Sequence, residues 1–215
     1  MEQSVRSVGV LDKSVALLRA LADGPAPLAG LVAATGIPKP TAHRLAVALV
    51  GHGLVRRTDD GGFALGAELV GLGRAAAEGW PWGDAAGPAL VGLVEATGES
   101  AQLYVREADG RRCLLSREST HELRTIVAEG ARLPLDRGSA GRILAGEAPV
   151  EGWVESVEER APGVASVSAP VRDGSGAVVA AVGISGPVDR LGPTPGARFG
   201  PAVVAAARRI EAALS

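Results

Sequence analysis

Residues 24–58, GPAPLAGLVAATGIPKPTAHRLAVALVGHGLVRRT, decide how the N-terminal part of the chain folds. The apolar spacing predicts two short helices separated by Thr35-Gly36-Ile37 and followed by a strand, which is the order of a winged helix-turn-helix. This stretch contains Lys39, Arg44, Arg56 and Arg57 but no carboxylate. A local electropositive surface on this architecture predicts contact with nucleic acid.

The composition of the 215-residue chain narrows this prediction. With 22 Lys and Arg against 24 Asp and Glu, the formal net charge is −2, so any basic contact surface must be regional. The length and an apolar content of 47% suit two domains with real cores. The single cysteine forms no internal disulfide, no signal peptide precedes the first helix, and no apolar run reaches the about 18 residues of a membrane span. We expect a cytoplasmic protein without membrane contact.

Helical spacing of apolar residues predicts helices over residues 9–22, from about 27 to 35 and from about 39 to 51. The third helix is expected to bury Leu45, Ala48 and Leu49. A helical wheel places five residues on the side away from this buried face: Lys39, Pro40, His43, Arg44 and Val47. The positive end of this helix suits phosphates and base edges in a major groove, although a solvated helix face is the alternative interpretation.

A β hairpin is expected after the third helix. Residues 54–57 and 62–65 read as short strands around Asp59-Asp60-Gly61-Gly62, where the Asp-Gly step favours a tight turn. This hairpin would be the wing, with Arg56 and Arg57 at its base, where flanking phosphates would lie.

The segment GVLDKSVALLRALADGPAPLAGLVAATGIPKPTAHRLAVALVGHGLVRRTDDGGFALG resembles the winged helix-turn-helix of the IclR family of bacterial transcription regulators. The resemblance continues through GARLPLDRGSAGRILA, APGVASVSAPVRDGSGAVVAAVGISGP and the last helix, so it covers most of the chain. Four segments are most similar in sequence to actinobacterial members linked to amino-acid metabolism: LAGLVAATG, PTAHRLAVAL, TGESAQLYVR and PGVASVSAPV.

The resemblance implies three domains or segments: a winged helix-turn-helix over 1–66, a linker helix over 67–79 and an effector-binding and oligomerisation domain over 80–215. Pro40, Thr41 and Arg44 match positions where the recognition helices of the family meet DNA, with Lys39 beside them. Arg6 matches an N-terminal arm. His43 is a candidate for base contact or an ordinary polar surface group, and His52 is expected to pack against or cap the third helix.

The linker helix carries an apolar stripe, Leu65, Leu69, Leu72 and Ala76, at helical spacing. Such a stripe commonly packs on its own domain. The resemblance implies that it also contacts a partner subunit, in a homodimer or homotetramer that binds a palindromic operator in double-stranded DNA.

The second domain is expected to be α+β. A helix over about 84–97 and a last helix flank strands over 100–106, 112–117, 123–128, 164–171 and 177–186. The resemblance implies the GAF-like α/β ligand-binding domain of the family.

No enzymatic activity is expected, and no cofactor or metal. Ser139, His121 and Asp136 supply the residue types of a hydrolase triad, but Gly138-Ser139-Ala140-Gly141 is not the Gly-x-Ser-x-Gly elbow. Three histidines and one cysteine show no ligand spacing, so Cys113 is expected to be a small buried hydrophobe.

Gly138 and Ser139 precede a short predicted helix, whose free N–H groups near Ser139 and Ala140 would suit a carboxylate or another anion. The alternative is that Ser139 simply caps the helix. The resemblance implies a pocket for a small-molecule effector, with an amino acid or a carboxylate as candidates, lined by Thr125, Ser139, Ala140, Ser156, Val164, Ser166 and Ser185.

Two features depart from the family pattern. Ser156 stands where an acid is common, and only residues 146–152 remain where relatives usually carry some thirty, including a helix. We therefore expect a more exposed pocket with weak effector binding. The chain is predicted to be a transcription regulator, repressor or activator, of metabolic genes, with amino-acid biosynthesis genes as one candidate class. A small-molecule sensor or assembly module without sequence-specific DNA binding is the rival hypothesis.

Overall fold

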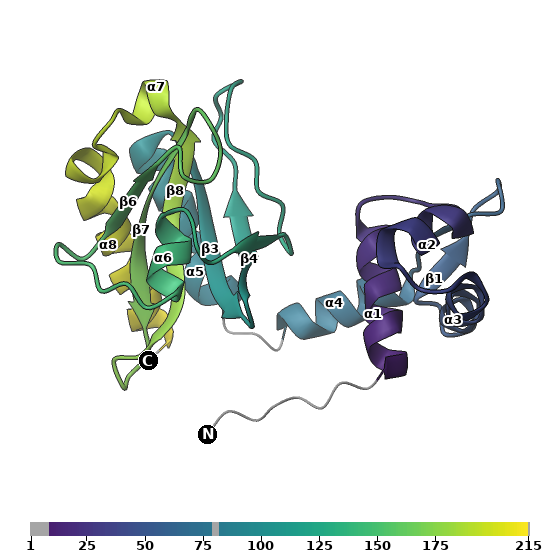
Figure 1. Ribbon diagram of the computed structural model, residues 1–215. Helices are drawn as coiled ribbons and strands as arrows, with labels where there is room; N and C mark the ends of the chain where they lie inside the picture. Colours follow the sequence, from purple (N-terminus) through teal and green to yellow (C-terminus); the bar gives the residue numbers. More distant parts are fainter. Residues whose placement is uncertain (1–8, 79–81, 215) are drawn as a thin grey trace. The chain divides into compact units, whose positions relative to one another are not determined.

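The computed structural model describes residues 9–78 and 82–214 (Figure 1). Contacts divide the chain into two compact units, Met1–Gly79 and Trp80–Ser215, and each unit has its own buried core. Arg6, the expected arm residue, lies outside the described residues.

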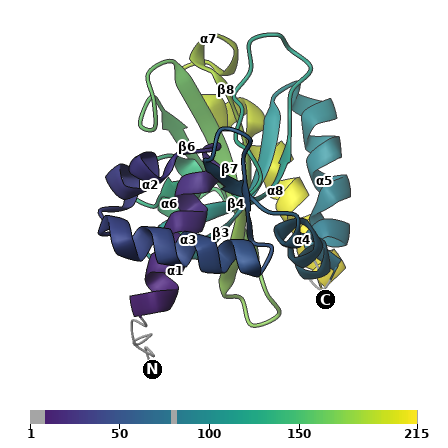
Figure 2. The same cartoon turned by 90° about the vertical axis from the view of Figure 1, so that its right-hand side faces the viewer.

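The N-terminal unit consists of three helices, a β hairpin and a fourth helix: α1 (Gly9–Ala22), α2 (Leu28–Thr35), α3 (Lys39–Gly51), β1 (Val55–Arg57), β2 (Phe63–Leu65) and α4 (Glu68–Glu78). Helix α3 crosses α1, as Figure 2 shows, and both contact α2. Strands β1 and β2 pair antiparallel, so the order is that of a winged helix-turn-helix.

The buried residues explain why these short elements hold together. Leu17 and Leu21 of α1, Leu31 of α2 and Leu45 of α3 meet around Phe63 of the hairpin. With eight residues, α2 is too short to be stable alone, so its helical form depends on this packing. It ends at a left-handed Gly36, whose N–H donates to the carbonyl of Val32.

One expectation for this unit is wrong. Ala48 is exposed, and the buried face of α3 is instead Ala42, Leu45, Ala46 and Leu49. These four positions follow i, i+3, i+4 and i+7, so α1 and α2 pack along a row slightly rotated from the predicted one. Of the two alternatives for His52, the structure shows the cap: its backbone N–H donates to the Ala48 carbonyl at 3.2 Å, and its side chain is exposed.

The C-terminal unit contains one sheet and four helices: α5 (Trp82–Thr97), β3 (Ser100–Glu107), β4 (Gly110–Arg117), β5 (Arg132–Pro134), α6 (Ser139–Leu144), β6 (Val154–Val157), β7 (Val164–Arg172), β8 (Val178–Pro187), α7 (Val188–Leu191) and α8 (Pro195–Leu214). The sheet is antiparallel, in the order β5-β4-β3-β8-β7-β6. Helices α5 and α8 cover one face and α6 lies on the other (Figure 1). The predicted α+β class is confirmed.

Strand alternation separates an apolar face from a polar one. In β3, Ala101 and Leu103 join the core beneath α5 and α8, whereas Gln102 and Tyr104 point to the opposite face. In β7, Val167 joins the same apolar core, and its neighbours Ser166 and Ser168 point away from it. The polar residues of the central strands therefore gather on the side of the sheet that carries α6.

The expected strand over 123–128 is wrong. Residues 118–131 form an irregular connection, and the strand that pairs with β4 is β5. The Thr125-Ile126-Val127 run has strand-forming residues, but β propensity reflects packing on a neighbouring strand more than an intrinsic backbone preference. Here the Ser116 N–H of β4 donates to the Glu129 carboxylate at 3.0 Å, so a side chain takes the place of a strand.

Within the described residues, the helices lack either the length or the apolar composition that crossing a membrane requires.

Candidate nucleic-acid interface and effector cavity

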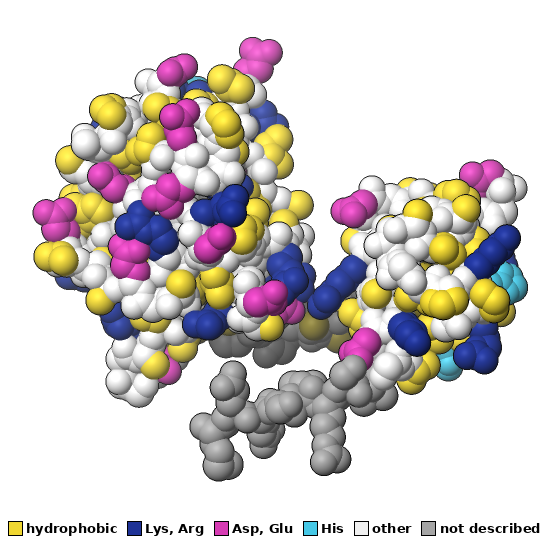
Figure 3. Space-filling view, in the orientation of Figure 1, with side chains coloured by type: hydrophobic (Ala, Val, Ile, Leu, Met, Phe, Trp, Pro, Cys, Tyr) yellow, Lys and Arg dark blue, Asp and Glu magenta, His cyan; other side chains and the backbone are white. Residues whose placement is uncertain are grey.

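The outward face of α3 carries basic side chains and belongs to a segment, residues 24–58, without acidic residues. Lys39, Pro40, His43 and Arg44 are exposed, and Thr41 is half-buried. The first turn contains no acidic residue, and Pro38 takes the N-cap position. Lys, Arg and His side chains gather on the side of the N-terminal unit where α3 lies (Figure 3). Because the N-terminal end of a helix is partially positive, this surface is suited to the phosphates and base edges of DNA.

The wing has a positive base and a negative tip. Arg57 lies over the ring of Phe63 at 4.2 Å and donates to the Gly61 carbonyl at 3.2 Å. Arg56 is also exposed but, as the next residue of the strand, points to the opposite face. At the tip, a hydrogen bond from Thr58 lowers the pKa of Asp60 and keeps its carboxylate charged. The charge distribution of the wing therefore suits a phosphate at its base better than at its tip.

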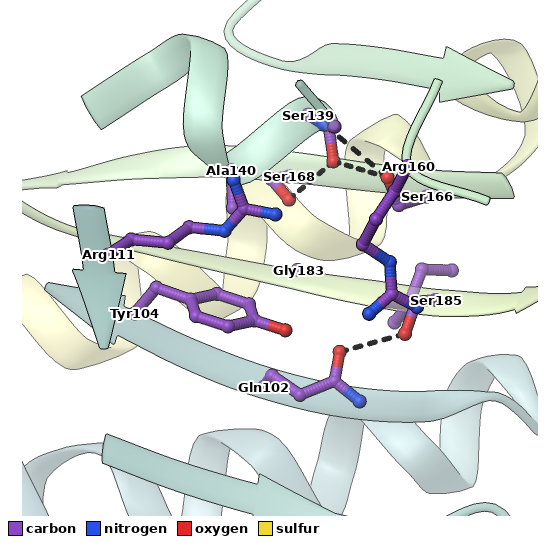
Figure 4. Close-up of a pocket in the computed structure, with 12 residues that line it drawn as sticks. Gln102, Tyr104, Arg111, Ser139, Ala140, Arg160, Ser166, Ser168, Gly183 and Ser185 are labelled. Atoms are coloured by element: carbon purple, nitrogen blue, oxygen red, sulfur yellow. Dashed lines mark hydrogen bonds between the residues drawn. The ribbon is translucent and has the colours of Figure 1, made fainter. Parts of the chain in front are cut away.

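In the C-terminal unit, polar side chains from several strands converge on a cavity beside α6 (Figure 4). It is lined by Gln102, Tyr104, Arg111, Gly138, Ser139, Ala140, Arg160, Ser166, Ser168, Gly183, Ile184 and Ser185. Its volume is about 20 Å³, which is room for about one water molecule.

Serine hydroxyls form the inner wall of the cavity. The Ser139 hydroxyl lies 2.8 Å from the hydroxyls of both Ser166 and Ser168. Ser185 donates to the side-chain oxygen of Gln102 at 3.0 Å. The interpretation of Ser139 as a helix cap is wrong, because Gly138 occupies the N-cap position and no side chain caps the helix. Gly138 has a φ of 79°, a conformation that favours glycine.

Of the N–H groups expected to be free at the start of α6, that of Ser139 is engaged, since it donates to the Ser166 hydroxyl at 3.4 Å. The preceding N–H, that of Gly138, donates to the Glu159 carboxylate at 3.0 Å. Glu159 also accepts from Arg142 at 2.8 Å. An internal carboxylate thus lies next to the Ser139 and Ala140 N–H groups where an external anion was expected.

Arg111 is a buried cation in the wall of the cavity. One terminal nitrogen, Nη1, donates to the carbonyls of Pro134 and Arg137, and the guanidinium lies 5.3 Å from the ring centre of Tyr104. Burial lowers the pKa of Arg111 and raises that of Tyr104, because each charged form loses solvation. Gly141 makes room for this arrangement, since a Cβ there would overlap Arg111 Nη1.

The structure brings together four of the seven expected effector residues: Ser139, Ala140, Ser166 and Ser185. Thr125, Ser156 and Val164 do not line the cavity. Ser156 pairs with Ser166 one strand further out, and Thr125 belongs to the irregular connection before β5.

Five lining residues with polar side chains were missed: Gln102, Tyr104, Arg111, Arg160 and Ser168. For Gln102 and Tyr104 a signal was present, since a polar residue alternating with apolar ones inside a buried strand must face something other than the core. No pattern in the sequence marks Arg111 or Arg160.

The shortened segment does not open the cavity, contrary to expectation. Ser139 and Ala140 are 1% and 4% exposed. The β6–β7 connection supplies both Glu159, which binds the Gly138 N–H, and Arg160, which lines the cavity. Residues 147–151 instead border a separate open groove of about 480 Å³ beside α8.

Ser139, His121 and Asp136 are not linked to one another by hydrogen bonds as a hydrolase triad would be. The hydroxyl of Ser139 bonds to the hydroxyls of Ser166 and Ser168, the backbone N–H of His121 donates to the Ser119 hydroxyl, and Asp136 pairs with Arg137. Over residues 9–78 and 82–214, no group of three His, Cys, Asp or Glu residues is placed to hold a metal ion. Cys113 is buried, and burial raises the pKa of its thiol to about 12, so it stays protonated.

Comparisons with known proteins agree with this geometry. Residues 10–59 match the family model described as the IclR helix-turn-helix domain, and residues 147–212 match the bacterial transcriptional regulator IclR C-terminal model. The chain is similar to the glycerol operon regulatory protein of Streptomyces griseus, at 29% identity over 231 positions that cover 87% of this chain and 88% of that protein. Because this alignment is longer than the 215 residues of the chain, it must contain gaps in the sequence of this chain. Such gaps agree with a chain that is shorter than other members of the family.

Solved structures share the fold. An IclR transcriptional regulator from Alicyclobacillus acidocaldarius gives a TM-score of 0.84 at 20% identity, covering 97% of this chain and 100% of that one. An IclR homologue from Microbacterium hydrocarbonoxydans, solved as a complex with 4-hydroxybenzoate, gives 0.78 at 21% identity, covering 96% and 99%. The two family models together match more than half of the residues. The chain belongs to the IclR family of bacterial transcription regulators and is a regulator rather than an enzyme.

Proposed function

We propose that this protein binds a palindromic operator in double-stranded DNA through α3 and changes its affinity for that operator when a small molecule occupies the cavity beside α6. The observation that carries the proposal is the outward face of α3, where Lys39, His43 and Arg44 are exposed on a segment free of acids. In this arrangement α3 enters the major groove and Arg44 reads a base edge.

The neighbouring residues have supporting roles in this proposal. Pro40 and Thr41 lie in the first turn of α3 and approach the backbone or base edges, while Arg56 and Arg57 contact flanking phosphates from the base of the wing. Arg6 follows the backbone or a minor groove as part of an N-terminal arm. Such a regulator acts in the cytoplasm, where the chromosome is accessible.

For the effector we propose a carboxylate, with an amino acid as one form. The polar cavity with two arginines in its lining supports an anionic group, and the relative from M. hydrocarbonoxydans is a complex with a carboxylate, 4-hydroxybenzoate. The relative in S. griseus is named for a glycerol operon, so we propose control of metabolic genes, of which amino-acid biosynthesis genes are one class.

A binding experiment separates this proposal from the rival, a sensor or assembly module without sequence-specific DNA binding. The protein should be retained on a duplex carrying its own upstream region and not on a scrambled duplex at the same salt concentration. Equal retention on both duplexes would favour the rival.

We further propose that α4 mediates self-association into a dimer or tetramer. Leu65 belongs to β2, so the part of the stripe on α4 is Leu69, Leu72 and Ala76. Leu72 is 53% exposed, Ala76 is exposed and Leu69 is half-buried, so the N-terminal unit leaves this stripe largely uncovered. An exposed apolar stripe of this kind suits a partner subunit.

Replacing Leu69→Asp together with Leu72→Asp should lower the oligomer mass measured by light scattering, because a charge buried at an apolar interface is costly unless it is paired. Ala67→Asp with Gly71→Asp is the matched control, since it adds the same two charges at exposed positions that a helical wheel places away from Leu69 and Leu72, and it should leave the mass unchanged. A wild-type protein that is already monomeric would refute the proposed role of α4.

A further inference from the structure

The lining of the cavity contains two cations and no acid. Arg111 enters from β4 and Arg160 from the β6–β7 connection, and no Asp or Glu belongs to the lining. The two arginines flank one point: a Cβ at Gly138 would lie 3.2 Å from Arg111 Nη2 and 3.9 Å from Arg160 Cβ. Figure 4 shows both guanidinium groups directed into the cavity. Each raises the electrostatic cost of the other unless negative charge lies near them.

Several hydrogen-bond donors at this cavity have no acceptor. Gln102 is 1% exposed and its side-chain oxygen accepts from Ser185, but its Nε2 has no partner within the described part of the chain. The same holds for Nε of Arg111, whose Nη1 is taken by two carbonyls. The remaining edge of Arg111, Nε with Nη2, has the geometry that binds two oxygens of a carboxylate or phosphate.

Arg160 is likewise without a counterion. Its neighbours are engaged elsewhere: Glu158 accepts from the Gly163 N–H at 2.7 Å, and Glu159 binds the Gly138 N–H and Arg142. Among residues 9–78 and 82–214, none forms a hydrogen bond or ion pair with Arg160. A buried donor that lacks an acceptor is costly, which applies to Gln102 Nε2 and Arg111 Nε. Together with the half-buried Arg160, these donors are complementary to a ligand that brings acceptors and negative charge.

We propose that the cavity takes a small dianion, a dicarboxylate or a phosphate monoester, with one anionic end on Arg111 and the other on Arg160. Arg160 is then the residue that sets the specificity for two charges over one. This inference rests on the proposed function, because it names the class of ligand for the same cavity.

The small volume of the cavity determines how a ligand could enter it. Room for about one water does not admit a dicarboxylate, so the side chain of Arg160 must withdraw as the ligand enters. Arg160 lies in the turn between β6 and β7, which is held at its base by the Glu158 N–H donating to the Val164 carbonyl at 2.8 Å. The arginine side chain has enough rotatable bonds to swing outward and then close on the outer end of the ligand.

Isothermal titration calorimetry on the full-length protein tests the inference. The probes are succinate, butyrate as a monoanion of the same length, neutral succinamide, and ethyl phosphate at pH 8, where it carries two charges. At least one of the two dianions should bind about tenfold more tightly than butyrate, and succinamide should not bind. Comparison of succinate with ethyl phosphate identifies which kind of dianion the cavity prefers.

Arg160→Gln should weaken the preferred dianion by about tenfold and change butyrate by less than about twofold, because only the dianion uses the second guanidinium. Arg208→Gln, at an exposed position of α8, removes the same charge and should change neither affinity. Butyrate binding as tightly as both dianions, or dianion affinity that survives Arg160→Gln, would overturn the inference.

The failure of the inference and the failure of the proposed function are separable. If none of the probes binds while the protein still selects its own upstream duplex, the dianion inference is overturned and the DNA-binding proposal stands. If a dianion binds through Arg160 and the duplexes are retained equally, the regulator proposal fails and the ligand inference stands.

Discussion

Arg44→Ala is expected to weaken binding to the specific operator by about 1–3 kcal/mol, the range for one good contact to a base edge. Arg44 is exposed on the outward face of α3, and the acid-free segment around it provides no internal counterion that would hold it away from DNA. The discrimination between operator and scrambled duplex should fall with it. Titration of both duplexes at one salt concentration measures the two quantities together.

Variants of the wing arginines should behave differently. Arg56→Ala and Arg57→Ala are expected to weaken binding to all sequences alike and to reduce the slope of log affinity against log salt by about one each, as for phosphate contacts. Arg19→Ala, at an exposed position of α1, removes the same charge away from α3 and is the control. Unchanged affinity in Arg44→Ala, Arg56→Ala and Arg57→Ala at moderate salt would show that this face does not bind DNA.

Phe63→Ala is expected to unfold the N-terminal unit while the C-terminal unit stays folded. Phe63 is buried among α1, α2 and α3, bridges to Ala26, and supports Arg57 on its ring. Truncating a buried Phe costs about 3–5 kcal/mol. That is comparable to what the core of a domain below about 70 residues supplies.

Thermal unfolding followed by circular dichroism measures this effect. The variant should lose one transition and its DNA binding, and it should retain the transition of the C-terminal unit together with ligand binding in the cavity. Phe63→Leu keeps most of the apolar volume and should lower the midpoint much less. Loss of all structure in Phe63→Ala would contradict the independence of the two cores.

The N-terminal unit was largely predictable because its signals are local. The helices over Gly9–Ala22 and Lys39–Gly51 have the predicted bounds, and the outward face of α3 carries the predicted residues. Helical periodicity, helix-ending glycines and Asp-Gly turns act between residues only a few positions apart. Ala48 was placed wrongly because the neighbouring helices select the buried row.

The cavity was predictable only in part, because its residues are distant in the chain. Ser185 bonds to Gln102 across 83 positions, and Ser139 to Ser168 across 29. The resemblance to a family placed Ser139, Ala140, Ser166 and Ser185 at the site. Antiparallel pairing of β3 with β8 and of β8 with β7 adds Gln102, Tyr104 and Ser168.

The sequence by itself determined the winged helix-turn-helix, the basic face of α3 and the α+β class, since these depend on residue spacing and local charge. Only the tertiary structure decided that residues 123–128 are not a strand, that Glu159 occupies the Gly138 N–H, and that Arg111 and Arg160 face one cavity. Those outcomes depend on which backbone and side-chain groups meet when the strands pair, and therefore on strand order and register.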